Sequence, residues 1–250
     1  MKPDVVAHRG LARLYPENSL SGVLAAAAAG LRHIEIDVQL SLDRVPLVYH
    51  DATLERVSGA RGDVRDLKWS QLKGLRVPEA GRFGAFYKSE RLCTLAALAK
   101  ALQRRRYRGV LFVELKEESL LRFGRASMLA AVDRALGKFK RQAVLISFDE
   151  PVLELARRAT RYKLGVVLRD VKRLRSPFMR ALDPEHVFCD VGLLPKKGQL
   201  KPALGLGPKA KLTVYEVPAL ATARELGARG ADLIETFSAD SLRQELARYR

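Results

Sequence analysis

The chain of 250 residues has only two cysteines, Cys93 and Cys189, and each lies in an apolar stretch. Two isolated cysteines are too few for a disulfide scaffold or a cysteine-ligated zinc site, so both classes are excluded and a cytoplasmic location is expected. Long apolar runs are also missing, because no stretch of about 18 uncharged apolar residues occurs, and a transmembrane helix is not predicted. The first residues lack the apolar core of a signal peptide, so the mature chain is expected to begin at Met1.

Acidic residues are scarce relative to basic ones. The chain has 28 Asp and Glu against 45 Lys and Arg, which gives a net charge of +17. A field of this sign concentrates anionic ligands, among them small phosphate esters, anionic membrane surfaces and nucleic acids. The basic residues form short scattered clusters without interleaved aromatics, which argues against a nucleic-acid groove. A small phosphodiester is therefore the expected partner, with an anionic membrane surface as a further candidate.

Apolar runs of the strand type alternate with helical runs over the whole length. The predicted strands are residues 5–7, 34–38, 45–49, 110–115, 143–148, 164–168, 187–191, 212–217 and 232–236. The predicted helices are residues 19–29, 95–102, 120–136, 151–160, 177–182, 219–226 and a last one capped by Asp240. The alternation predicts an α/β protein with a parallel sheet. This length favours a TIM (β/α)8 barrel, one domain over residues 1–250, rather than an open doubly wound sheet.

Two stretches interrupt the alternation. Residues 53–92 separate a strand from its helix by more than an ordinary loop, and they contain the only tryptophan, Trp69, in a candidate short helix at 67–75. Loops of this length are commonly lids or caps, so we expect a small inserted lid or cap region after the third strand. Residues 193–208, rich in Lys, Pro and Gly, are a second candidate for a segment that folds over a strand end.

Charged and titratable residues lie at the carboxyl ends of several predicted strands. These residues are His8, Glu35, Asp37, His50, Glu114 and Lys116. Alternate residues of a strand share a face, so Glu35 lies beside Asp37, and Glu114 beside Lys116. The carboxyl ends of barrel strands form the rim where active sites lie. Charges inside a barrel are unfavourable unless they are paired or bind a cation, so the pattern predicts a hard-cation site suited to metal-assisted attack on a phosphate ester.

Several of these residues also have a simpler interpretation. Glu114 and Lys116 could form an ion pair across the rim, and Asp51 could either orient His50 or begin a turn. His33 and His186 lack such a context and are interpreted as structural. Asp149 is either a strand-end residue or a helix cap, and Glu216 remains ambiguous.

A set of motifs closely resembles the glycerophosphodiester phosphodiesterase family in order and spacing. The motifs are His8-Arg9-Gly10, Pro16-Glu17-Asn18-Ser19, Glu35-Ile36-Asp37-Val38-Gln39-Leu40, Pro46-Leu47-Val48-Tyr49-His50-Asp51, Asp66-Leu67-Lys68-Trp69, Cys93-Thr94-Leu95, Glu114-Leu115-Lys116 and Ser147-Phe148-Asp149. The likeness is strong over the first 55 residues and loose after residue 150.

The resemblance implies a TIM barrel with a divalent ion, Mg²⁺ or Ca²⁺, that hydrolyses glycerophosphodiesters to glycerol 3-phosphate and an alcohol. Roles are implied for nine residues: Glu35, Asp37 and Glu114 as metal ligands, Arg9 and Lys116 as phosphate-binding residues, His8 and His50 as acid and base, and Glu17 and Asn18 as supports. Which histidine is the acid stays open. So does the attacking oxygen, which is either water or a substrate hydroxyl that closes a cyclic phosphate.

The last third of the chain departs from the family pattern. Members tend to carry a Trp where this chain has Tyr215-Glu216-Val217-Pro218, and they often end a strand in Thr-Asp where it has Glu235-Thr236-Phe237-Ser238. The leaving alcohol is therefore open, and a lysophospholipase D-like reaction on a lipid is an alternative. A hypothesis of a different class is a non-catalytic basic barrel that binds nucleic acid, with salt-sensitive retention and no metal-dependent turnover. The oligomeric state is not predicted.

Overall fold

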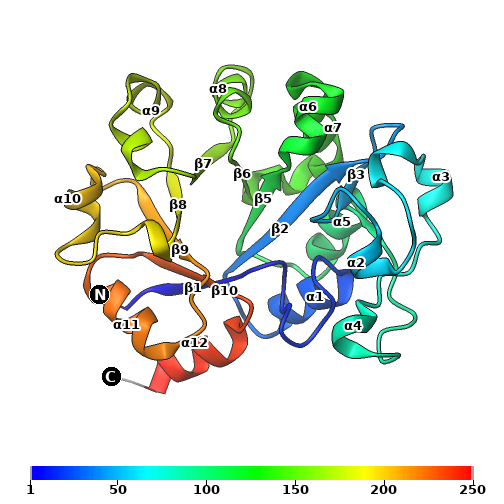
Figure 1. Ribbon diagram of the computed structural model, residues 1–250, viewed down its shortest axis with the longest axis horizontal. Helices are drawn as coiled ribbons and strands as arrows, with labels where there is room; N and C mark the ends of the chain where they lie inside the picture. Colours follow the sequence, from blue (N-terminus) through cyan, green and yellow to red (C-terminus); the bar gives the residue numbers. More distant parts are fainter. Residues whose placement is uncertain (1, 249–250) are drawn as a thin grey trace.

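The computed structural model describes residues 2–248, and within them eight parallel strands close into a barrel surrounded by helices (Figure 1). Going round the barrel, the strands are β1 (Asp4–Ala7), β2 (His33–Leu40), β5 (Val110–Leu115), β6 (Ala143–Ser147), β7 (Lys163–Leu168), β8 (His186–Asp190), β9 (Lys211–Tyr215) and β10 (Leu233–Thr236). The barrel closes because β1 pairs with β10 on one side and with β2 on the other. The predicted TIM barrel is therefore confirmed.

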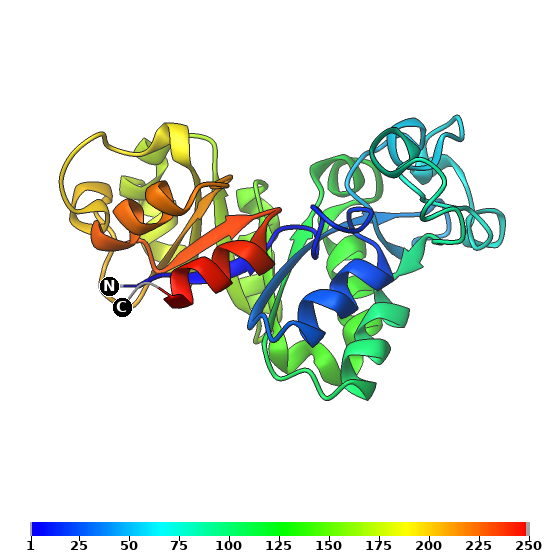
Figure 2. The ribbon, with the colours of Figure 1, turned by 90° about the horizontal axis from the view of Figure 1, so that it is seen from below.

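Helices cover the outer face of the barrel (Figures 1 and 2). They are α1 (Leu20–Ala28), α5 (Leu95–Arg104), α6 (Glu117–Phe123), α7 (Arg125–Leu136), α8 (Glu150–Ala159), α9 (Pro177–Leu182), α10 (Leu200–Leu204), α11 (Leu220–Ala228) and α12 (Ala239–Arg248). Several of these helices begin at a capping residue, whose side chain accepts a hydrogen bond from a backbone N–H in the first turn. The Ser19 hydroxyl caps α1, Thr94 caps α5, and the Asp149 carboxylate accepts from the Val152 amide at 2.7 Å to cap α8.

The two-residue period of the strands decides which side chains enter the barrel. On β2, Ile34, Ile36 and Val38 belong to the main core between barrel and helices, so the alternate residues of that strand face inward. A second apolar cluster, which includes Val6, Phe112, Phe188 and Leu233, fills the barrel interior. Side chains two residues further along these strands continue on the same inner face toward the carboxyl-end rim.

Three predicted features are wrong in detail. The predicted strand 45–49 is present as β3 (Pro46–Val48), but it pairs antiparallel with β2 outside the barrel. Only residues 41–45 connect the two strands, and a parallel neighbour would need a crossover of about a dozen residues or more. The predicted helix 120–136 is broken at Gly124, whose φ of +86° ends α6 and precedes α7. The last helix begins at Ala239, so Asp240 lies in its first turn.

Residues 53–92 fold beside the barrel around a small core of their own (Figure 2). They contain α2 (Glu55–Ser58), the 3₁₀ turn η1 (Val64–Asp66), α3 (Trp69–Leu72) and α4 (Ala80–Phe83), and β4 (Cys93–Thr94) returns the chain to β3. In the barrel numbering the insertion lies between the second and third strands, because β3 is not a barrel strand. Within residues 2–248, no helix is long and apolar enough to cross a bilayer.

The two histidines that the sequence analysis interpreted as structural lie at the amino ends of their strands. The His33 Nδ1 atom lies 3.2 Å from an Asp4 carboxylate oxygen, and the His186 ring packs edge-on against Phe112 at 4.9 Å. Burial lowers the pKa of His186 from 6.5 to about 4, and the positive charge of Lys211 acts in the same direction.

This histidine should make the fold sensitive to acid. Between pH 6.5 and about 4 the unfolded chain binds a proton at His186 that the folded chain does not, so stability falls as the pH is lowered through this window. The loss should reach about 3 kcal/mol, and His186→Phe should remove it. Urea unfolding of both proteins at neutral pH and near pH 4 measures the effect. Equal losses in the two proteins would contradict it.

Candidate active site

A cavity of about 160 Å³ opens at the carboxyl-end rim of the barrel. Six of the nine residues predicted for the site line it: His8, Arg9, Glu35, His50, Glu114 and Lys116. The other three, Glu17, Asn18 and Asp37, are buried and contact the lining residues through hydrogen bonds or ion pairs. The structure thus brings together residues from the barrel strands β2 and β5, from the loop after β1 and from the segment after β3.

Three carboxylates from β2 and β5 form the acidic centre of the cavity. One oxygen of each of Glu35, Asp37 and Glu114 lies within 4.8 Å of the others, and the Glu35 Oε1 atom is buried without a hydrogen-bond partner. Burial and then the Asp37 charge raise the pKa of Glu35 well above its ordinary value, and the same two causes raise the pKa of Glu114 to about 7. A hard-oxygen donor set with an unpartnered buried atom fits a divalent cation such as Mg²⁺ or Ca²⁺.

Two cations flank the carboxylates. The Arg9 guanidinium donates to Glu17 at 3.0 Å and lies 3.1 Å from Asp37, and its backbone N–H donates to Glu35 at 3.0 Å. The Lys116 ammonium donates to Glu114 at 2.9 Å and lies 3.4 Å from Asp37. Burial would raise the pKa of Asp37, but Lys116 and Arg9 hold it well below its usual range. Asp37 is therefore ionised at neutral pH.

Supporting residues fix these groups from behind. The Asn18 side chain donates to the Asp37 carboxylate at 2.9 Å and accepts from the Asp37 amide at 3.1 Å, so the carboxylate has one orientation. Glu17 accepts from Arg9 and also from Arg56 on α2, at 2.6 and 2.8 Å. The insertion that carries α2 is thereby tied to the site.

His8 follows β1 and is held on two sides. Its Nδ1 atom lies 2.9 Å from a Glu216 carboxylate oxygen, and its ring stacks on Phe237 with centroids 4.5 Å apart and planes 6° from parallel. The other oxygen of Glu216 accepts from the Phe237 amide at 2.9 Å. Burial lowers the pKa of His8, and the hydrogen bond to Glu216 opposes that shift. These contacts direct Nε2 toward Glu35, from which it lies 3.9 Å away.

His50 follows β3 and has an arrangement of the same kind. Its Nδ1 atom lies 2.7 Å from an Asp51 oxygen, and Asp51 accepts two further hydrogen bonds from Arg56 at 2.7 and 2.8 Å. The Gln39 side-chain Nε2 donates to the His50 carbonyl at 3.1 Å. Burial would raise the pKa of Asp51, but hydrogen bonds from Arg56 and His50 lower it to about 2. The sequence left open whether Asp51 orients His50 or begins a turn. The contact with the imidazole supports the first interpretation.

Three residues of the cavity region were not assigned from the sequence. Glu216 was ambiguous, Phe237 was noted only as a departure from the family pattern, and Glu235 lines the cavity, with its Oε1 atom buried and unpartnered. Burial and then the Glu216 charge raise the pKa of Glu235 well above its ordinary value. Glu216 and Glu235 could have been assigned from the sequence, because each lies at the carboxyl end of a predicted strand, as the assigned residues do.

Comparison with known proteins places this chain in a family. A family model described as the Glycerophosphoryl diester phosphodiesterase family matches residues 8–202. A glycerophosphodiester phosphodiesterase of Caldanaerobacter subterraneus subsp. tengcongensis is 29% identical over 169 residues, which are 67% of this chain and 67% of that protein. Human glycerophosphodiester phosphodiesterase 1 is 32% identical over 100 residues, 40% of this chain but only 30% of that protein.

Solved structures agree on the fold. An Oleispira antarctica phosphodiesterase, solved in complex with the product sn-glycerol-3-phosphate, has a TM-score of 0.84 and 23% identity, with 98% of this chain and 97% of that chain covered. The family match over residues 8–202 takes in more than half of the chain and all nine predicted site residues. The chain therefore belongs to the glycerophosphoryl diester phosphodiesterase family, a family of phosphoric diester hydrolases.

Proposed function

We propose that this protein hydrolyses glycerophosphodiesters to glycerol 3-phosphate and an alcohol, with His8 and His50 as acid and base beside a divalent metal ion. One observation carries the proposal: two histidines, two cations and a carboxylate cluster surround a single small cavity. Family membership supports the reaction class, and the name of the bacterial relative supports the substrate class.

The side chains of this site can bind a phosphodiester and move its protons. Arg9 and Lys116 supply positive charge for the phosphoryl oxygens, whose negative charge grows as the new bond forms. His8 and His50 each have Nδ1 beside a carboxylate, which leaves Nε2 available to take or give a proton. One imidazole takes the proton of the attacking oxygen, and the other gives a proton to the departing alkoxide.

The metal would be held by Glu35, Asp37 and Glu114. When bound, a divalent ion supplies a charge that polarises the phosphoryl oxygens. Asn18 orients Asp37 for this role, and Lys116 partly balances the negative charge of the carboxylates. We also propose that residues 53–92 cap the site, since Arg56 of that segment binds both Glu17 and Asp51.

The wall of the cavity opposite the carboxylates is largely apolar. It consists of Ile146, Phe148, Val167, Phe188 and Tyr215. A small apolar-walled cavity favours a short leaving alcohol over a long acyl chain, which would have to lie outside it. The glycerophosphodiester is thus the preferred substrate class, and the lysophospholipid is the alternative to be tested beside it.

A panel of phosphodiesters tests the proposal directly. The full chain would be assayed with Mg²⁺ or Ca²⁺ on glycerophosphocholine, glycerophosphoethanolamine, lysophosphatidylcholine and an RNA oligomer. Release of glycerol 3-phosphate from the first two is the expected result. Hydrolysis of the lysophospholipid alone would replace the substrate class, and turnover of no phosphodiester, together with salt-sensitive RNA retention, would favour the binding protein instead.

Glu216 should act as a positioning residue for His8. Glu216→Gln keeps an acceptor for Nδ1 but removes the charge, so we expect kcat to fall about tenfold, whereas Glu216→Ala should lower it about 100-fold. KM should change little in both, because the carboxylate does not line the cavity. Steady-state kinetics measure the split between kcat and KM.

The matched control is Glu225→Gln, which removes an acid of α11 that pairs with Arg229 just after that helix. It should leave both constants unchanged. A Glu216→Gln enzyme with wild-type kcat, or one that loses activity only through a raised KM, would contradict the role of Glu216 in holding His8.

A further inference from the structure

A hollow of about 490 Å³ lies at the other end of the barrel from the candidate active site. Arg32 stands directly before β2, and residues 105–109 stand directly before β5, so the hollow is at the amino ends of these strands. The catalytic side chains lie at their carboxyl ends. We call this hollow the arginine pocket; it is lined by Leu24, Ala27, Ala28, Gly30, Leu31, Arg32, Arg105, Arg106, Tyr107, Arg108 and Gly109.

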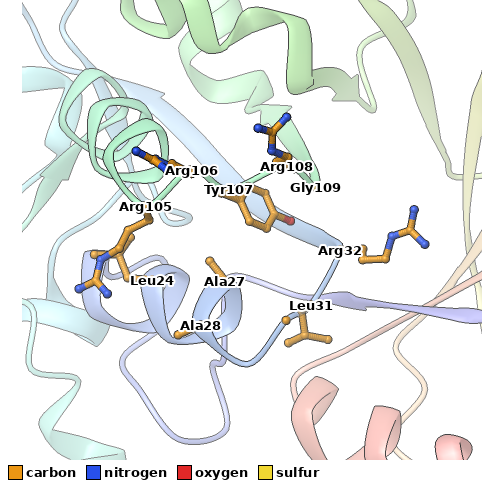
Figure 3. Close-up of a pocket in the computed structure, with 11 residues that line it drawn as sticks. Leu24, Ala27, Ala28, Leu31, Arg32, Arg105, Arg106, Tyr107, Arg108 and Gly109 are labelled. Atoms are coloured by element: carbon orange, nitrogen blue, oxygen red, sulfur yellow. The ribbon is translucent and has the colours of Figure 1, made fainter.

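Its charge is of one sign. Four of the eleven lining residues are arginines, all with exposed side chains, and none is acidic. Figure 3 shows Arg105 and Arg106 on one side of the pocket and Arg32 on the opposite side. Over residues 2–248, none of the four forms a close ion pair or a side-chain hydrogen bond, but Arg32 lies near enough to Asp4 for its charge to lower the pKa of that carboxyl. An excess of positive charge around a hollow attracts an anion.

The floor between the arginines is apolar. Leu24, Ala27 and Leu31 come from α1 and the turn after it, and the Tyr107 ring lies over them (Figure 3). A pocket with a cationic rim and an apolar floor suits a ligand that joins an anionic group to a short hydrocarbon part.

The backbone of the pocket is held in place without a ligand. The Tyr107 amide donates to the Leu102 carbonyl at 3.0 Å, and the Val110 amide donates to the Arg32 carbonyl at 2.8 Å. Gly109 allows the close approach, since a Cβ there would lie 2.2 Å from the Tyr107 hydroxyl and 2.3 Å from the Arg32 carbonyl oxygen. A preformed pocket loses little ordering entropy when it binds.

The guanidinium groups of the arginine pocket favour one kind of anion over others. A guanidinium offers a planar fork of donors that matches phosphate oxygens, and several such groups around one hollow favour a phosphate over a single carboxylate. Successive nucleic-acid bases would need exposed aromatic faces, whereas Tyr107 is the only aromatic residue lining the pocket and is buried.

We propose that the arginine pocket is a second, non-catalytic site that binds the phosphate group of a small phosphate ester, either a free compound or the headgroup of an anionic phospholipid. No active-site residue contributes to it, so the proposal stands independently of the catalytic one. A protein docked by this face to a membrane would leave its catalytic rim directed toward water.

The test uses the full chain and the double variant Arg32→Gln/Arg108→Gln. In one arm, glycerol 3-phosphate is titrated while the arginine Nε–Hε resonances are followed by NMR, so that the pocket is distinguished from Arg9 in the active site. In the other arm, the protein is sedimented with phosphatidylcholine vesicles with or without phosphatidylglycerol. Loss of two charge-assisted contacts should weaken binding by about tenfold or more.

The control double variant Arg104→Gln/Arg134→Gln removes the same charge from exposed residues that do not line the pocket. Pocket-dependent binding in the first arm identifies a soluble phosphate ester, and pocket-dependent binding in the second alone identifies a lipid headgroup. If neither arm depends on the pocket, or the control weakens binding equally, the proposal is overturned.

A further variant separates binding from folding. Arg106 has a φ of +54°, which glycine adopts without strain, so Arg106→Gly should keep or raise the Tm while binding weakens.

Discussion

His8→Ala and His50→Ala should each lower kcat on glycerophosphocholine by about 10²- to 10⁴-fold, the usual contribution of a positioned general acid or base. Both imidazoles line the same cavity, and each has Nδ1 beside a carboxylate that fixes the ring. The effects of the two substitutions on kcat should not be additive, because both proton transfers belong to one reaction. The double variant should therefore be little slower than the slower single variant.

A change of leaving group separates the two histidines. A p-nitrophenyl ester departs without protonation, so the variant that lacks the acid should recover much of its activity on this substrate, while the variant that lacks the base should not. His33→Gln is the matched control, since His33 is a buried histidine that lies at the amino end of β2 beside Asp4, away from the cavity. Its turnover per folded molecule should match the wild type. Wild-type kcat in either His8→Ala or His50→Ala would remove that histidine from the mechanism.

Much of this arrangement followed from local sequence. Glu35 and Asp37 are separated by one residue on a strand whose other positions are Ile34, Ile36 and Val38, so the strand period alone places both carboxylates inside the barrel. The strand 110–115 was predicted with its observed bounds, and the same rule places Glu114. The topology then brings these strand ends to one rim, as any closed parallel barrel does.

Contacts that form only when the barrel closes could not be predicted from the sequence. Glu216 contacts His8 across 208 positions of sequence, and Phe237 reaches the same ring from the end of β10. Such contacts are fixed only when β9, β10 and β1 lie side by side, and no local pattern encodes them.

Removal of divalent ions should abolish turnover, and addition of Mg²⁺ or Ca²⁺ should raise the thermal stability of the metal-free protein. A ligand that binds only the folded state stabilises it by roughly 2.7 kcal/mol at 100 times its Kd. Glu35→Gln should eliminate this stabilisation, because the unpartnered Oε1 atom belongs to the proposed ligand set. The same substitution removes a carboxyl whose ionised form is disfavoured by burial and by Asp37, so the metal-free variant should be at least as stable as the wild type.

The cluster of Glu17, His50 and Asp51 provides the matched comparison. Its ligand atoms are also close enough to share an ion, but the Arg56 guanidinium already lies between the two carboxylates, with hydrogen bonds of 2.6 to 2.8 Å to both. Asp51→Asn should therefore preserve the metal-induced rise in Tm that Glu35→Gln eliminates. Differential scanning fluorimetry with and without EDTA measures both. A rise that survives in Glu35→Gln and is lost in Asp51→Asn would move the metal to the His50 side and would leave Glu35, Asp37 and Glu114 as a charge network balanced only by Arg9 and Lys116.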